Sequence, residues 1–143
     1  MKTRIITALV LLIFFSGGLQ AQVKPAVPAL PVLEIYYFHP NERCPIDQSI
    51  EENLRKLIQS EYAREVKEGT IRFKVVNTDD KTQAKLVSSF DINAQALWFI
   101  KQEKGKEIKT DLTEFAFANG LSNVDKFKVG IRDEIAKALK GVK

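Results

Sequence analysis

The alternation of hydrophobic and polar positions predicts four strands. Residues 32–38 (VLEIYYF) form an apolar, aromatic-rich run that is typical of a buried strand. Residues 70–77 (TIRFKVVN) alternate between apolar and polar positions, and residues 95–101 (QALWFIK) form a third apolar run. Gly105 then predicts a tight turn into a fourth strand at 107–110.

Helical spacing separates these strands. Apolar residues recur at steps of three or four from Ile46 to Val66, which predicts one long helix that begins at Pro45 and ends at Gly69. A short helix is predicted from residue 79 or 80 to about residue 90, because either aspartate can cap it. Two further helices are predicted near the end of the chain, at 111–119 and 124–139.

The predicted order is strand, helix, strand, helix, strand, strand, helix, helix. Helical crossovers join the first three strands, so we expect these three to be parallel. The fourth strand follows a tight turn and should be antiparallel to the third. The fold class is therefore α/β, with a central four-stranded mixed sheet flanked by helices. This is the element order of a thioredoxin-like domain.

Residues 1–21 have the pattern of a secretory signal peptide. Lys2 and Arg4 precede an apolar run, and Ala21 offers the cleavage site. The run is shorter than the ~20 apolar residues that span a bilayer, so we expect no stable membrane span after cleavage; an uncleaved anchor is the alternative. The protein should then be extracytoplasmic, and periplasmic in a bacterium. Residues 22–31 are proline-rich and predict an extended linker, which leaves 32–143 as the folded domain.

Charge and composition narrow the classes of function. The chain carries 22 Lys+Arg against 18 Asp+Glu, and loss of Lys2 and Arg4 with the signal would leave 20 against 18, a net charge of +2. So small a charge excludes nucleic acid as a partner. With one cysteine and one histidine, the chain cannot form an internal disulfide or a metal site built from several of either residue. No nucleotide or flavin signature is present, and we expect no cofactor.

The residues with candidate catalytic side chains lie between the first predicted strand and the first predicted helix, at 43–47 (RCPID). A thiolate at Cys44 would be stabilised by the helix dipole and by free backbone N–H groups. Arg43 would support that negative charge, whereas Asp47, one helical turn on, would oppose it. A lone thiol can attack a disulfide but needs a second thiol to release the product. We therefore expect a protein or small-thiol partner; an unpaired exported thiol can also link two chains into a disulfide-bonded homodimer.

The same region carries a resemblance to a known family. Four stretches match: 32–44 (VLEIYYFHPNERC), 50–53 (IEEN), 73–78 (FKVVNT) and 111–117 (DLTEFAF). They resemble exported thioredoxin-like proteins of Bacteroidetes, the nitrophenyl compound nitroreductase subunit ArsF family. The resemblance implies a thioredoxin-like fold with an R-C-x-x-C redox motif at this junction. Here Asp47 replaces the second cysteine, and residues 94–96 (AQA) lack the proline that thioredoxins place before this strand.

Three hypotheses for the function follow. In the first, Cys44 performs monothiol exchange, which would make the protein an enzyme. In the second, the protein is a non-catalytic thioredoxin-fold module that binds a protein or peptide in a groove formed by Pro45, Gln95 and Ala96, and Cys44 only caps the helix. In the third, Cys44 and His39 carry a metal such as copper. Otherwise His39 tunes the thiol or forms a local hydrogen bond at the end of its strand.

Overall fold

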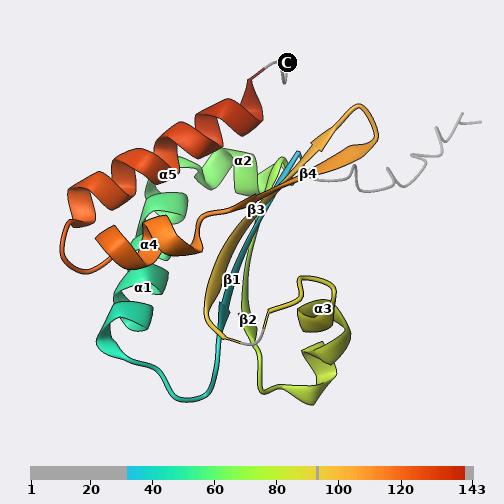
Figure 1. Cartoon of the computed structure of the whole chain (residues 1–143). Coiled ribbons are helices and arrows are strands. Elements are labelled where there is room, and N and C mark those ends of the chain that lie inside the picture. The colour runs from blue at the N-terminus through green and yellow to red at the C-terminus, as the bar shows by residue number, and fades with distance from the viewer. Residues whose placement is uncertain (1–31, 93, 141–143) are drawn as a thin grey trace, which may run out of the picture.

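The computed structural model describes residues 32–92 and 94–140, which are arranged around one four-stranded sheet (Figure 1). The strands are β1 (Leu33–His39), β2 (Ile71–Asn77), β3 (Ala96–Glu103) and β4 (Lys106–Asp111). The helices are α1 (Pro45–Glu61), α2 (Ala63–Lys67), α3 (Ala84–Ser88), α4 (Thr113–Asn119) and α5 (Val124–Leu139), and a 3₁₀ turn, η1 (Lys81–Gln83), precedes α3. The predicted signal peptide and linker lie outside the described residues.

The sheet is mixed, with the order β2-β1-β3-β4. β1 pairs in parallel with β2, whereas β3 runs antiparallel to both β1 and β4. The α/β class and the mixed four-stranded sheet are confirmed, but the expectation of three parallel strands is wrong. The pairing shows how: Ala96, the first residue of β3, lies opposite Phe38 of β1, which also pairs with Val76 near the end of β2. β3 therefore begins at the end of the sheet where β2 finished, and runs the other way.

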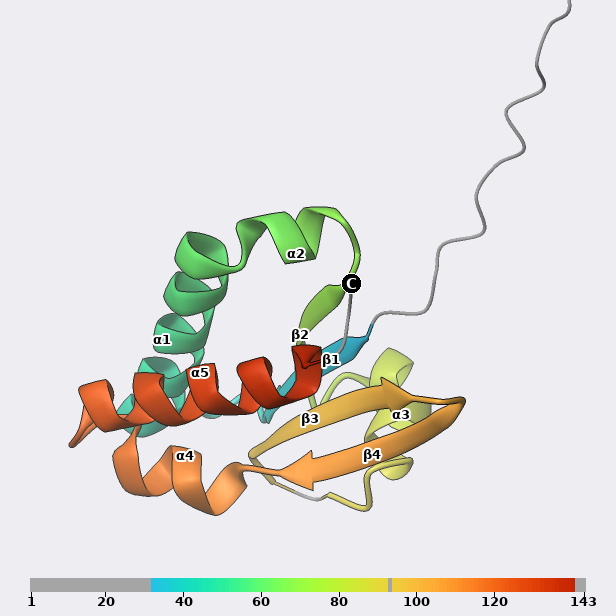
Figure 2. The same cartoon turned by 90° about the horizontal axis from the view of Figure 1, so that it is seen from above.

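Helices cover the two faces of the sheet unequally. Among the α-helices of the described residues, α1, α4 and α5 lie on one face of the sheet, and the short α3 lies on the other (Figures 1 and 2). Side chains alternate along β1, so Leu33, Ile35 and Tyr37 enter the main core with α1 and α5. Tyr36 and Phe38 enter a second, smaller core beneath α3. The main core thus lies directly behind the first turns of α1, where the candidate site begins.

The helix predicted to run from Pro45 to Gly69 is divided into α1 and α2. The chain leaves helical geometry at Tyr62 (φ −125°, ψ 21°), which ends α1 and precedes α2. The break falls where the Tyr62 side chain packs against the main core. Gly69 adopts φ +77°, a left-handed conformation that suits glycine after a helix, so the predicted end point is confirmed. In the described part of the chain, no helix is long and apolar enough to cross a membrane.

Candidate functional site

Cys44 is the N-cap residue of α1, immediately after the loop that follows β1. Its backbone is extended (φ −87°, ψ 166°), and Pro45 occupies the first helical position. Proline is well tolerated there because the first N–H groups of a helix have no intrahelical partner. The Cys44 side chain is exposed. The junction therefore forms the helix start that the sequence predicts and leaves Cys44 exposed.

Asp47 is fully buried below Cys44, and its carboxylate accepts hydrogen bonds from three other residues. Its Oδ2 atom accepts from the Cys44 backbone N–H at 3.0 Å, from Cys44 Sγ at 3.1 Å and from Gln95 Nε2 at 3.1 Å. The Tyr37 hydroxyl lies 3.4 Å from Oδ1 and 3.1 Å from the Asp47 carbonyl oxygen. Cys44 and Asp47 thus form a capping box, and its carboxylate is held from below by the sheet.

These contacts keep Asp47 ionised. Burial raises the pKa of Asp47, but the hydrogen bonds from Cys44, Gln95 and Tyr37 outweigh it, and the pKa falls below its ordinary value of 3.8. Burial, reinforced by the charge of Asp47, raises the pKa of Tyr37, so its hydroxyl remains a donor. The Cys44 thiol donates to a carboxylate, and a thiolate there would face a negative charge at 3.1 Å. The structure thus places the Asp47 carboxylate beside the Cys44 sulfur, one helical turn along α1.

The Arg43 side chain forms an ion pair and a hydrogen bond with residues of α1. Its Nη2 atom lies 2.6 Å from Glu51 Oε2 and 3.3 Å from the Asp47 carbonyl oxygen. Glu51 also pairs with Arg55 at 2.6 Å. Burial raises the pKa of Glu51, but its hydrogen bonds to Arg55 and Arg43 have the larger combined effect. The pKa of Glu51 therefore lies below its ordinary value, and the side chain is ionised. The guanidinium of Arg43 is thus neutralised by Glu51, which weakens the support that the sequence predicts for a thiolate.

The other predicted site residues are divided between this site and its surroundings. Pro45 is exposed next to Cys44, but Ala96 is buried in the second core and cannot line a groove. His39 ends β1, and its Nδ1 atom lies 2.9 Å from the carbonyl oxygen of Pro40, the local bond that was one of the alternatives. Within 32–92 and 94–140, no group of three or more His, Cys, Asp or Glu side chains is placed to hold a metal ion.

Sequence reasoning missed two residues of the site, Tyr37 and Glu51. Tyr37 is fully buried on the α1 side of β1, and a buried tyrosine hydroxyl needs a hydrogen-bond partner. That need was the available signal, although alternation along the strand could not name Asp47 as the partner. Helical spacing predicts for Glu51 only the pair with Arg55, four residues on, which the structure contains. Its pair with Arg43 depends on the path of the loop before the helix, which the sequence does not reveal.

Comparison with known proteins adds little to this geometry. No protein-family model matches the chain, and no curated protein matches it. One solved structure that is similar in part is described as "Structure of a malarial protein". It is 15% identical, the match covers 61% of this chain and 93% of that chain, and the TM-score is 0.41. A likeness this weak establishes neither a shared fold nor a shared activity.

Proposed function

We propose that this chain is a thioredoxin-like protein that exchanges its single thiol, Cys44, with disulfides. The observation that carries the proposal is the exposed Cys44 sulfur at the N-terminus of α1, directly after the first strand. The order of strands and helices and the resemblance of 32–44 to an exported redox family support it. Thiol exchange is a chemistry that a single exposed thiol can perform without a metal or cofactor.

The exchange proceeds in two steps. A Cys44–partner S–S bond forms as the disulfide bond of the partner breaks, and the proton of the Cys44 thiol ends on the departing sulfur. The chain has one cysteine, so the mixed disulfide must be released by an external thiol. That thiol attacks the partner's sulfur, forms a new disulfide with the partner and transfers its proton to the Cys44 sulfur, which becomes a thiol again. Asp47 occupies the place of a second cysteine and slows the first step, because its carboxylate opposes a thiolate at Cys44.

Substituting Asp47→Asn should raise the rate at which Cys44 is alkylated at neutral pH by about tenfold, the effect of one unit charge at this distance with water-like screening. Asparagine keeps an oxygen for the Cys44 N–H but removes the charge. The measurement is the rate of iodoacetamide labelling of the folded protein against pH. Glu52→Gln is the matched control, since Glu52 is an exposed acid of the same helix that pairs with Lys56. Equal rates in the wild type and Asp47→Asn would show that Asp47 does not restrain the thiol.

The exchange itself is tested by incubating the folded protein with glutathione disulfide and recording its mass. We expect a mixed disulfide on Cys44 that a small thiol removes, and no adduct on Cys44→Ser. An adduct that forms only after denaturation would contradict the proposal.

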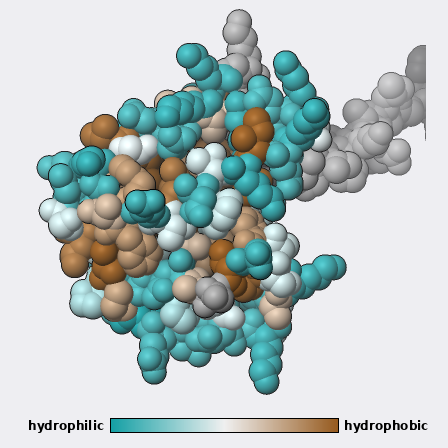
Figure 3. All heavy atoms as spheres, viewed as in Figure 1, coloured by the Kyte–Doolittle hydropathy of each residue, from teal (hydrophilic) through white to brown (hydrophobic). Residues whose placement is uncertain are grey.

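A second candidate function is a non-catalytic module that binds a protein or peptide. It is favoured by apolar side chains that gather over α4 and the start of α5 on one face of the molecule (Figure 3). Leu121, which follows α4, and Val129 of α5 are 52% and 53% exposed. Ser49 of α1 donates to the carbonyl of Gly120 at 2.7 Å, so this surface adjoins the helix that begins at Cys44. A folded protein whose Cys44 is inert toward disulfides would favour this candidate over exchange.

We also propose that the protein is exported and that its mature chain begins at Gln22. Expressed from Met1 in a bacterial host, it should accumulate in the periplasm without residues 1–21. Mass spectrometry of the purified protein measures this directly. Ala21→Asp should block processing, because signal peptidase requires a small residue at that position. Recovery of the wild-type protein with residues 1–21 still attached would contradict cleavage.

A further inference from the structure

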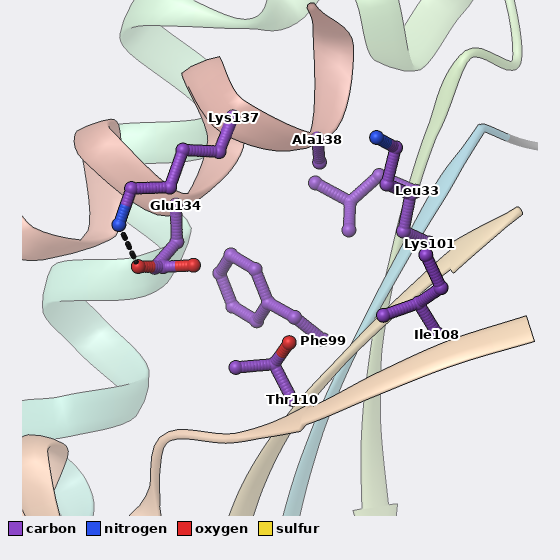
Figure 4. Close-up of a pocket in the computed structure, with 8 residues that line it drawn as sticks. All are labelled: Leu33, Phe99, Lys101, Ile108, Thr110, Glu134, Lys137 and Ala138. Atoms are coloured by element: carbon purple, nitrogen blue, oxygen red, sulfur yellow. Dashed lines mark hydrogen bonds and ion pairs between the residues drawn. The ribbon is translucent and has the colours of Figure 1, made fainter. Parts of the chain in front are cut away.

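A pocket of about 210 Å³ opens between α5 and the β3–β4 hairpin (Figure 4). It is lined by Leu33, Phe99, Lys101, Ile108, Thr110, Glu134, Lys137 and Ala138. Leu33 is the first residue of β1, whereas Cys44 follows the last residue of that strand. The pocket therefore lies at the opposite end of β1 from the thiol, some ~23 Å along the strand, and is a separate feature from the proposed exchange site.

The interior of the pocket is apolar. Leu33, Phe99 and Ala138 form its floor and are 0%, 3% and 6% exposed, so they belong to the main core. Ile108 forms a wall and is 46% exposed, although its neighbours in the exposed strand β4 are charged or polar. Solvated apolar surface is unfavourable, and an apolar group that fills this space would remove part of it from water.

The rim of the pocket is charged. The lining residues include two lysines, Lys101 and Lys137, and one carboxylate, Glu134. Lys137 pairs with Glu134 at 2.6 Å, and Lys101 pairs with Glu103 at 3.1 Å. In Figure 4 the Lys137 side chain extends along α5 toward Glu134, above the ring of Phe99. Exposed ion pairs of this kind contribute little to stability, so a ligand carboxylate can replace Glu103 or Glu134 as a lysine partner at small cost.

We propose that this pocket binds a small monoanionic amphiphile, a carboxylate carried on a short alkyl or aryl body. The apolar body would lie against Phe99 and Ile108, and the carboxylate would meet Lys101 or Lys137. Each of these lysines has a glutamate partner at the surface, and the ligand carboxylate would take the place of that partner. The volume is below the ~300 Å³ at which pockets for drug-sized ligands begin and equals that of roughly seven waters, so it suits one ring or a short chain.

Octanoate is the probe, titrated into isotopically labelled protein and followed by NMR. The amide signals of Leu33, Phe99, Ile108 and Ala138 should shift saturably, with a Kd of about 1 mM for a ligand of this size. Octanol should bind at least about fivefold more weakly, because it lacks the charge that the lysines recognise. The absence of a saturable shift, or equal affinity for octanol and octanoate, would overturn the proposal.

Two variants and one control locate the site. Ile108→Glu should weaken octanoate binding by at least about tenfold, because it places a second carboxylate against the ligand. The double variant Lys101→Gln/Lys137→Gln should weaken octanoate binding by about fivefold and leave octanol binding unchanged. It also tests the proposal if Ile108→Glu fails to fold. Val66→Glu is the matched control, since Val66 is an exposed apolar residue of α2 that does not line the pocket. An equal loss in Val66→Glu would indicate unspecific adsorption and overturn the proposal.

Discussion

The Asp47→Ala variant is expected to lose about 3 kcal/mol of unfolding free energy, the combined cost of a helix cap and of buried hydrogen bonds to a charged group. Alanine leaves the Cys44 N–H and Gln95 Nε2 without the acceptor that each has at 3.0–3.1 Å. It also leaves the fully buried Tyr37 hydroxyl with a single acceptor, the carbonyl oxygen of residue 47. Urea denaturation at pH 7, followed by circular dichroism, measures the loss.

Two further variants separate these contributions. Asp47→Asn keeps an acceptor oxygen of the same shape, so its expected loss is only about 1 kcal/mol. Glu52→Ala removes an exposed acid from the same helix, and its effect should stay within about 0.5 kcal/mol. If Asp47→Ala were as stable as Glu52→Ala, the hydrogen bonds around Asp47 would contribute nothing to the fold.

The contribution of Asp47 should depend on pH in a defined direction. Its pKa is lower in the folded protein than its ordinary value of 3.8, so the folded state binds this proton less readily than the unfolded state does. The stability that the charge provides is therefore complete above the ordinary pKa and is lost as the pH falls toward the pKa of the folded state. The difference in unfolding free energy between the wild type and Asp47→Asn should be constant from pH 5 to 7 and shrink below about pH 4.

The elements of this fold were predictable from local pattern, but the direction of β3 was not. Periodicity places a strand at 95–101 and cannot tell which end of the sheet it enters. That depends on how the connection after β2 packs. The sequence predicts a helix over most of 79–90, whereas the structure divides this stretch into a 3₁₀ turn and a five-residue helix whose Leu86 and Val87 pack against the second core. β3 then enters the sheet opposite Phe38, at the end where β2 finished, and this direction follows from tertiary packing that the local pattern does not encode.

The candidate site was predictable as far as its helix. Pro45 and Asp47 are signals for a helix start, and they place Cys44 at the cap without any tertiary information. The partners beneath the cap come from β1 and from the segment before β3. Tyr37 and Gln95 meet Asp47 only because β1 and β3 are neighbours in the sheet. Burial of Asp47 and the direction of its pKa shift therefore follow from sheet order, which no motif in the chain encodes.

The Gly120→Ala variant is expected to lose about 2–3 kcal/mol of unfolding free energy, at the upper end of the range for overpacked cores. Gly120 follows α4 at the point where that helix meets α1. A Cβ atom there would overlap Cγ1 of Ile50, and it would lie 2.7 Å from the carbonyl oxygen of Ala116. Ile50 is fully buried and the second obstacle is backbone, so neither can move aside cheaply. Thermal and urea denaturation measure the loss.

Gly105→Ala separates this steric cost from the cost of backbone conformation. Gly105 has φ +76° and open space around it, whereas Gly120 has φ −65°, so Gly105→Ala should lose about 1 kcal/mol through backbone strain alone. In a double-mutant cycle, Gly120→Ala and Ile50→Ala should together lose less than the sum of the single losses, because the shorter side chain makes room for the new methyl group. Strict additivity would mean that Ile50 is not the obstacle. Since Ser49 Oγ donates to the Gly120 carbonyl, a displaced α4 would also disturb the first turns of α1, and with them the position of Cys44.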